Sequence, residues 1–333
     1  MSTRHSGAQA LSNKIRRTGL LAVAAAIGAS AFAAEPVWDA NKVELNSLEL
    51  AKGVHALVPA NADHAHRGVP LATTSGIIAG SKGVLVIDTM INERLANQVL
   101  NHVKSKTKLP IRYALNTSYH GDHSFGNQYF PRSTAIIQHV NAKNYIDANF
   151  DKDVQFMRGA FGEGRGIEKA KARTGDILVP KDGKLELDLG GKIVQIIDFG
   201  FAQTGGDLFV WDPQSKVLFA GNPVIAQQPA LPWLLDGHLQ ETLATMQRVH
   251  DFLPADARIV PGHGPVVGRD ALQWHIGYLA ELKMQVAQAL EKGMTLEQTV
   301  AAVELPQYKG YAIYDWVHKQ INVPAAYKEL RKP

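Results

Sequence analysis

Two imidazoles and a carboxylate fall within four residues of this chain, at His120, Asp122 and His123. They follow the apolar run Ile111–Leu115, which is typical of a buried strand, so we expect them on the loop where that strand ends. In a fully extended chain His123 would point away from the other two, but Gly121 lets the backbone turn. Nitrogen and carboxylate ligands suit a borderline cation, with zinc the first expectation and manganese or iron as alternatives. The other interpretation is an ordinary polar loop.

The motifs around this cluster resemble those of a known family. Over about residues 54–264 the chain resembles the metallo-β-lactamase superfamily, whose signature His-x-His-x-Asp-His corresponds to residues 118–123, with Ser118 in place of the first histidine. The strand and aspartate that precede the signature in the family correspond to residues 84–89, with Asp88. Residues 203–207, 219–222 and 262–264 resemble the family's His-Thr-x-Gly-Asp, Phe-x-Gly-Asp and Gly-His-Gly motifs. Five segments in this order are far more specific than any one motif.

The resemblance implies ligands for two metal ions, and this chain departs from the family at the first of them. That ion is commonly held by three histidines, and the corresponding residues here are Ser118, His120 and Gln203. The aspartate that bridges the two ions corresponds to Asn222. His120 remains available as a ligand, whereas Gln203 and Asn222 could offer only amide oxygens, which bind zinc less well than imidazole does.

The second site of the family is complete in this chain. The resemblance assigns it to Asp122, His123 and His263. Because the inferred ligand set contains a single carboxylate, we expect one divalent metal ion per chain, of the zinc type, and no second ion. Three protein ligands with an open fourth position form the geometry of a catalytic zinc, which lowers the pKa of a bound water to about 7.

Neighbouring side chains are predicted to act beside the ion. His120 could hold or deprotonate the water, and Asn222 or Gln203 could hydrogen-bond a developing oxyanion. The predicted catalytic group is therefore His120, Asp122 and Asn222. Asp88 could orient a ligand histidine. The residues expected to line the substrate are Ser118, Tyr119 and Gln203.

These features favour a metal-dependent hydrolase that acts on an ester, thioester, lactone or lactam-like bond of a small molecule. A non-catalytic or accessory binding protein on the same fold is an alternative, because three altered positions are a substantial loss. An atypical two-metal hydrolase is another. Nothing in the sequence selects among the possible substrates.

Residues 1–33 are typical of a cleavable export signal. Basic residues within 14–17 precede an apolar stretch at residues 20–26 and the small-x-small sequence Ala31-Phe32-Ala33, so we expect the mature chain to begin at Ala34. The apolar stretch is shorter than the roughly 20 residues that span a bilayer. We expect a periplasmic or secreted protein that is not attached to the membrane after signal removal, and Arg16-Arg17 would be compatible with twin-arginine export.

The net charge of +4 does not indicate nucleic-acid binding. The first 33 residues hold four basic and no acidic side chains, so the remaining 31 Lys and Arg balance the 31 Asp and Glu. The sequence shows no Lys and Arg stripe interleaved with aromatic residues, so we expect no nucleic-acid partner. Because cysteine is absent, a metal must be held by histidine, carboxylate, amide or water.

The apolar patterns predict two groups of strands, each followed by helices. The first group covers residues 54–58, 76–79, 84–88, 111–115 and 135–138, with a helix at 92–103. The second covers residues 185–189, 193–197, 207–211, 217–219 and 259–260, with a helix at 239–252. Together with the resemblance, this pattern implies a mixed α/β fold, a four-layer αββα sandwich over residues 34–268 that begins with a polar arm at 34–50.

Residues 269–333 are predicted to form a helical extension packed on the same domain. Helices are expected at residues 271–292, 296–303 and 308–319, with a last short helix from Asn322, and this extension could mediate a homodimer. The polar, glycine-rich residues 152–171 are expected to form a lid or a mobile excursion. His139 is expected to be structural, and the cluster Asp63-His64-Ala65-His66 a solvated loop rather than a metal site.

Overall fold

The computed structural model describes residues 40–60, 72–226, 231–309 and 314–331. The predicted export signal and the Asp63-His64-Ala65-His66 cluster lie outside these residues, so both stay predictions. Among the helices of the described ranges, none is long and apolar enough to pass through a membrane.

The first sheet has seven strands that lie side by side in chain order. Neighbours from β1 to β4 are antiparallel, and neighbours from β4 to β7 are parallel. The strands are β1 (Leu45–Ala51), β2 (Val54–Pro59), β3 (Ser75–Ala79), β4 (Val84–Ile87), β5 (Ile111–Leu115), β6 (Ala135–His139) and β7 (Ile177–Val179). Parallel neighbours need crossover connections, and two of these are α2 (Glu93–Lys106), which Asn92 caps, and α4 (Val140–Phe161).

Two expectations for this part of the chain are wrong. The polar arm predicted to extend through Leu50 contains β1, in which only Leu45 and Leu50 are buried, so the strand lacks a regular apolar alternation. The expected lid at residues 152–171 begins inside α4, which continues to Phe161. The sequence of that helix lacks a strong apolar pattern because the helix buries few apolar side chains, Ile146 and Met157 among them.

The second sheet has six strands in the order β13-β12-β11-β10-β9-β8. β11 and β12 are parallel, and the other neighbours are antiparallel. The strands are β8 (Lys184–Asp188), β9 (Ile193–Ile197), β10 (Phe209–Asp212), β11 (Val217–Ile225), β12 (Arg258–His263) and β13 (Val267–Gly268). β11 is longer than predicted and buried throughout, and α5 (Leu239–Phe252) connects it to β12.

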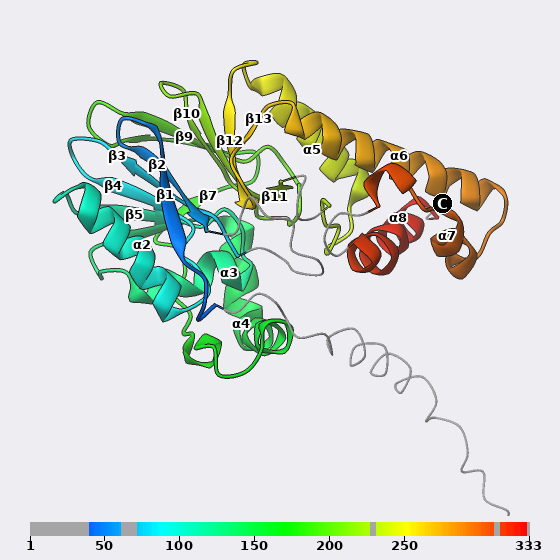
Figure 1. The fold of residues 1–333 in the computed structure, drawn as a ribbon, viewed down its shortest axis with the longest axis horizontal. Helices are drawn as coiled ribbons and strands as arrows, with labels where there is room; N and C mark the ends of the chain where they lie inside the picture. The colour runs from blue at the N-terminus through cyan, green and yellow to red at the C-terminus, as the bar shows by residue number, and fades with distance from the viewer. Residues whose placement is uncertain (1–39, 61–71, 227–230, 310–313, 332–333) are drawn as a thin grey trace, which may run out of the picture. The chain divides into compact units, whose positions relative to one another are not determined.

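Figure 1 shows the two sheets stacked on one another with helices on their outer sides. Three clusters of buried apolar side chains lie between these layers. One cluster joins α2 to the outer face of the first sheet, through Leu95 and Val86 among others. A second lies between the two sheets and includes Leu85 and Val210. The third joins the second sheet to α5 and to the helices near the C-terminus. This arrangement confirms the predicted αββα sandwich.

The C-terminal helices share the third cluster with the second sheet. They are α6 (Ala271–Glu291), α7 (Leu296–Ala302), a π-helix (Asp315–Asn322) and α8 (Val323–Leu330). The predicted start of the helix at Tyr308 is wrong, because Pro306–Tyr308 is a separate 3₁₀ turn after which Lys309 is extended, whereas residues 315–319 are helical as predicted. The π-helix, with its wider turns, is a geometry that often accompanies functional sites.

Candidate metal centre

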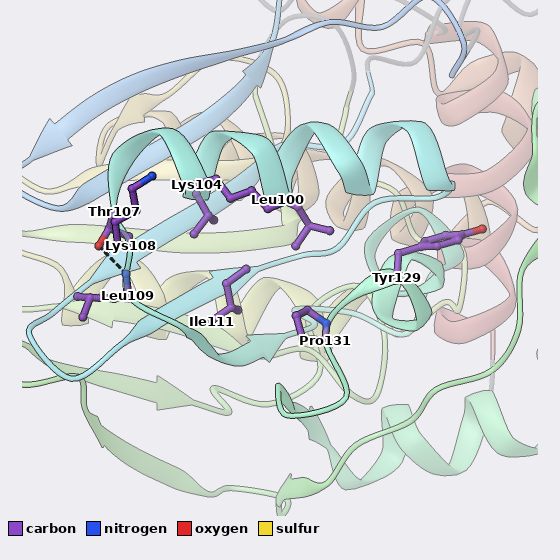
Figure 2. A pocket seen from close by; sticks show the side chains of 9 residues that line it. Leu100, Lys104, Thr107, Lys108, Leu109, Ile111, Tyr129 and Pro131 are labelled. Atoms are coloured by element: carbon purple, nitrogen blue, oxygen red, sulfur yellow. Dashed lines mark hydrogen bonds between the residues drawn. The ribbon is translucent and has the colours of Figure 1, made fainter.

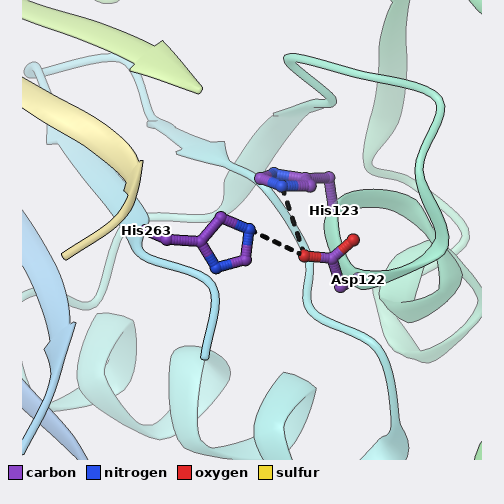
Figure 3. Close-up of side chains that lie close together, drawn as sticks. All are labelled: Asp122, His123 and His263. Atoms are coloured by element: carbon purple, nitrogen blue, oxygen red, sulfur yellow. Dashed lines mark ion pairs between the residues drawn. The ribbon is translucent and has the colours of Figure 1, made fainter. Parts of the chain in front are cut away.

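The predicted ligands come from the ends of strands in both sheets. β5 ends at Leu115, and the loop that follows leads into the single helical turn α3 (Gly121–Ser124), which carries Asp122 and His123. His263 is the last residue of β12 and forms an isolated bridge with Thr73, just before β3. Figure 3 shows the His263 ring facing Asp122 and His123 from the opposite side. The fold thus brings together residues that are 140 positions apart in the chain.

The three side chains converge on one region. The Oδ2 atom of Asp122 lies 3.3 Å from Nε2 of His123 and 3.2 Å from Nε2 of His263. One ligand atom of each side chain lies within 4.8 Å of the other two, and all three residues are buried. Two imidazole nitrogens and one carboxylate oxygen at these separations fit a single divalent ion of the zinc type.

The electrostatics of the centre depend on the burial of opposite charges close together. Burial raises the pKa of Asp122, but the His123 and His263 imidazoles outweigh this effect and hold it well below its usual range. Burial also lowers the pKa of His123, while the carboxylates of Asp122 and Asp88 raise it, with a net result of about 9. The carboxylates of Asp122 and Asp88 therefore favour the protonated form of His123, and a metal ion held at this centre would take the place of that proton.

Residues outside the ligand group orient His123 and Asp122 through hydrogen bonds. Asp88 Oδ2 accepts from Nδ1 of His123 at 2.8 Å, so the predicted contact between Asp88 and a ligand histidine is present. The same carboxylate accepts from the backbone N–H and the hydroxyl of Thr117, both at 2.8 Å, which fixes its orientation. Thr73 donates to Asp122 Oδ2 at 2.6 Å. The role of Thr73 has no signal in the sequence.

A buried amide network holds the loop that carries Asp122 and His123. Asn116 donates to the backbone oxygen of His123 at 2.9 Å, and Asn127 donates to Asn116 Oδ1 at 2.8 Å. Gln138 donates to the same oxygen, and Thr89 donates to Asn127 Oδ1. The role of these amides was not predicted. Asn116 and Asn127 lie just before and just after the motif, so their position in the sequence is a signal that could have identified them.

Asn222 links the two histidines of the signature. Its Oδ1 accepts from Nε2 of His123 at 2.8 Å, and its Nδ2 lies 2.9 Å from Nδ1 of His120. A Cβ atom on Gly262 would lie 2.6 Å from Asn222 Oδ1, so glycine at this position leaves room for the amide. His120 therefore contacts Asn222 and is not a member of the group formed by Asp122, His123 and His263.

The remaining predicted residues surround His120 or lie in the adjoining loops. Ser118 is buried, and its hydroxyl accepts from the backbone N–H of His120 at 3.3 Å. Gln203 is 2% exposed, and neither end of its amide has a hydrogen-bond partner among the described residues. The Tyr119 ring stacks on Tyr145, with 3.8 Å between centroids. An orphaned buried amide is costly, so Gln203 is suited to contact a bound molecule or water.

His139 has the structural role expected of it. It caps the first turn of α4, where its Nδ1 accepts from the backbone N–H of Asn141 at 3.0 Å, and its Nε2 lies 3.3 Å from Asp198.

A groove of about 570 Å³ lies away from this centre. Figure 2 shows the side chains that line it. It runs between the C-terminal half of α2 and Ile111, the first residue of β5, whereas the ligands follow the last residue of that strand. Its lining includes Leu100, Lys104, Leu109, Tyr129 and Pro131. The groove therefore does not contribute to the metal centre.

Comparison with solved structures identifies the same fold in several proteins. A metallo-β-lactamase from Pontibacter korlensis is 19% identical with a TM-score of 0.59, over 71% of this chain and 99% of that one. The inverting sec-alkylsulfatase Pisa1 from Pseudomonas sp. is 17% identical with a TM-score of 0.65, over 86% of this chain and 50% of that one. The DIM-1 metallo-β-lactamase is 14% identical with a TM-score of 0.57, over 72% of this chain and 99% of that one.

The family comparison covers the centre itself. A family model described as the metallo-β-lactamase superfamily matches residues 68–263, which is more than half of the chain and includes Asp122, His123 and His263. The match agrees with the order of motifs along the sequence and with the two stacked sheets whose strand ends carry these residues. The chain thus belongs to the metallo-β-lactamase superfamily.

Proposed function

We propose that this protein is a metal-dependent hydrolase that uses one divalent ion of the zinc type, held by Asp122, His123 and His263. The convergence of these three buried side chains, each with a ligand atom within 4.8 Å of the others, carries the proposal. The substrate class is a small molecule with an ester, thioester, lactone or lactam-like bond. Fold alone does not establish activity, so the proposal depends on the chemistry of this site.

The surroundings of the centre favour one ion over two. The positions that hold another ion in the superfamily are Ser118, His120, Gln203 and Asn222 in this chain, and none of them is a carboxylate. Asn222 makes hydrogen bonds to both His120 and His123. A second divalent ion would therefore lack an anionic ligand to offset its charge and its lost hydration.

A bound ion of this type supplies Lewis acidity, which polarises the substrate and makes water nucleophilic near neutral pH. The protein's own groups prepare the site for that chemistry. Burial lowers the pKa of His120, so its ring is neutral near pH 7. Because Asn222 Nδ2 donates to Nδ1 of His120, the ring proton is on Nε2. We propose that His120 donates this proton in a hydrogen bond to the oxyanion that develops on the substrate.

Metal analysis of the purified protein after zinc loading tests the proposal. We expect one ion per chain, lost in His263→Ala and in Asp122→Ala. Gln203→Ala is the matched control, because it removes another buried polar side chain that does not belong to the group of three ligands, and it should retain the ion. An ion-free wild type would instead support an accessory binding protein, and two ions per chain would support a two-metal enzyme.

Activity needs a separate test. A panel of chromogenic esters, thioesters, lactones and β-lactams covers the proposed substrate class, and a sulfate ester is added because one structural relative is a sec-alkylsulfatase. Turnover of at least one compound that disappears in His263→Ala supports hydrolysis. A protein with one tightly bound ion and no turnover of any compound would contradict the enzymatic part of the proposal.

We further propose that the protein acts in the periplasm or outside the cell, on the basis of residues 1–33. N-terminal sequencing of the exported protein should begin at Ala34. Intact residues 1–33 in a cytoplasmic fraction would contradict export. A homodimer through the C-terminal helices stays a prediction, and light scattering of the purified protein measures it directly.

A further inference from the structure

Residues 231–238, which precede α5, contact the predicted metal ligand His263 and the neighbour of His120, Tyr119. The Trp233 ring lies at 24° to the His263 ring, with 6.2 Å between centroids. Further along the segment, Asp236 accepts a hydrogen bond from the hydroxyl of Tyr119. The Tyr119 ring in turn meets the His120 ring edge-on, with 5.1 Å between centroids. The segment therefore extends from a predicted metal ligand to the residues beside His120.

The C-terminal helices hold this segment through Asn322, the last residue of the π-helix. Asn322 Oδ1 accepts from the backbone N–H of Leu234 at 2.9 Å, and its Nδ2 donates to the backbone oxygen of Pro232 at 2.7 Å. Asn322 is fully buried. One amide side chain thus binds the backbone oxygen before Trp233 and the backbone N–H after it, as a neighbouring strand binds the backbone in a sheet.

A chain of hydrogen bonds fixes the orientation of the Asn322 amide. Its Nδ2 also donates to the hydroxyl of Tyr278 at 2.9 Å, and that hydroxyl lies 2.8 Å from Nδ1 of His318. His318 Nε2 must donate to the backbone oxygen of Val303, at 2.7 Å, so its Nδ1 accepts from Tyr278. Every donor in this series of hydrogen bonds has an acceptor, so the bonds are all satisfied in only one of the two orientations of the Asn322 side-chain amide.

Two other contacts from the C-terminal helices reach the same segment. The Trp316 ring, also on the π-helix, meets the Trp233 ring edge-on, with 5.5 Å between centroids. Glu329 on α8 accepts from the backbone N–H groups of Leu239 and Gln240, directly after the segment. The segment is therefore fixed at both ends by the part of the chain that follows the sandwich.

We propose that residues 231–238 form the wall of the metal centre that determines substrate specificity, and that Asn322 is the positioning residue for this wall. Trp233 presents an indole beside His263, so the wall favours substrates with an apolar or aromatic group on that side of the scissile bond. Asn322 does not touch the substrate and acts by holding the backbone on both sides of Trp233. The inference rests on the proposed hydrolytic function for its substrate, but not for the positioning itself.

Hydrogen–deuterium exchange of the purified protein tests the positioning and needs neither substrate nor zinc. In Asn322→Ala, the peptide containing residues 231–238 should exchange about tenfold faster, because Leu234 loses its buried acceptor. The matched control is Tyr327→Phe, which removes the hydrogen bond from α8 to Met294 between α6 and α7, and among the described residues no hydrogen bond or ring contact joins Tyr327 to the segment. Unchanged exchange in Asn322→Ala, or equal acceleration in both variants, would overturn the positioning role.

Kinetics with p-nitrophenyl acetate and p-nitrophenyl butyrate test the wall. Trp233→Ala should lower kcat/KM for the butyrate about tenfold more than for the acetate, since the longer acyl chain loses its apolar surface. Asn322→Ala should raise KM for the butyrate, with kcat and zinc content near those of the wild type. Tyr327→Phe should leave KM, kcat and zinc content unchanged. Equal losses for both esters in Trp233→Ala would overturn the specificity role. Absence of zinc and of hydrolysis in the wild type overturns the proposed function, whereas the exchange result still decides the positioning.

Discussion

Asp88→Asn should weaken metal binding without disturbing the backbone. Asp88 has a φ of 59°, a left-handed conformation that asparagine adopts more readily than most residues do. The replacement keeps the size of the side chain and one oxygen for the Thr117 N–H. It also places an amide N–H where the carboxylate accepts from Nδ1 of His123. The His123 ring is then favoured with its proton on Nε2, which is the nitrogen that faces Asp122 and His263.

The size of this effect follows from the hydrogen bond that is lost. Asp88 Oδ2 and His123 Nδ1 lie 2.8 Å apart, with both side chains buried. A hydrogen bond to a charged group stabilises by about 1.5–3 kcal/mol. At 1.4 kcal/mol for each factor of ten, the loss predicts zinc affinity about 10- to 100-fold weaker than wild type.

Competition with a chromogenic chelator measures this affinity at fixed pH. Thr117→Val is the matched control, because it removes the hydroxyl that donates to Asp88 Oδ2 and leaves the contact between Asp88 and His123 in place. Its zinc affinity should stay close to that of the wild type. If Asp88→Asn binds zinc as tightly as Thr117→Val does, then Asp88 does not control the His123 ring and the reasoning fails.

Two further predictions concern stability. Tyr278→Phe leaves His318 Nδ1 and one N–H of Asn322 without partners in the core, so urea denaturation should show a loss of about 2–4 kcal/mol, and a loss near zero would contradict the network. Burial raises the pKa of Asp207 to about 6, so its contribution to stability is present below pH 4 and is lost as pH rises through 6. From pH 4 to pH 7 the free energy of unfolding of Asp207→Asn should therefore gain about 3 kcal/mol relative to wild type, and parallel pH profiles would contradict this.

Elements with strong local signals could be predicted from the sequence. The helix Leu239–Phe252 and the strand Ile193–Ile197 have the predicted bounds. The helix has a regular apolar face and ends before Pro254, and the strand follows Gly190 and Gly191, which adopt positive φ angles at the hairpin turn. In such segments the local preference and the tertiary packing agree.

Elements stabilised by distant partners could not be predicted in this way. β1 buries few apolar side chains, and its place in the sheet depends on pairing with β2. The π-helix Asp315–Asn322 depends on buried contacts of Asn322 with residues about 90 positions earlier. A pattern within one segment carries no information about either partner.

The same distinction applies to the site. Asp122, His123 and His263 could be proposed as a group because their residue types suit a metal and their motifs have a known order. Thr73 is an ordinary hydroxyl residue until the bridge between Thr73 and His263 places it 2.6 Å from Asp122. The contact of Trp233 with His263 likewise depends on how the C-terminal helices hold residues 231–238.

The charges that touch the ligand set are consistent with one ion. Asp122 is a ligand carboxylate, and Asp88 is a second carboxylate in direct contact with ligand His123. With neutral imidazoles at His123 and His263, these two negative charges balance a single divalent cation in a buried site. A second divalent ion would leave two positive charges without anionic partners, because Asn222 and Gln203 are neutral amides. The loss of the bridging carboxylate therefore changes the centre as a whole, and without an ion the amide in its place hydrogen-bonds both His120 and Nε2 of His123.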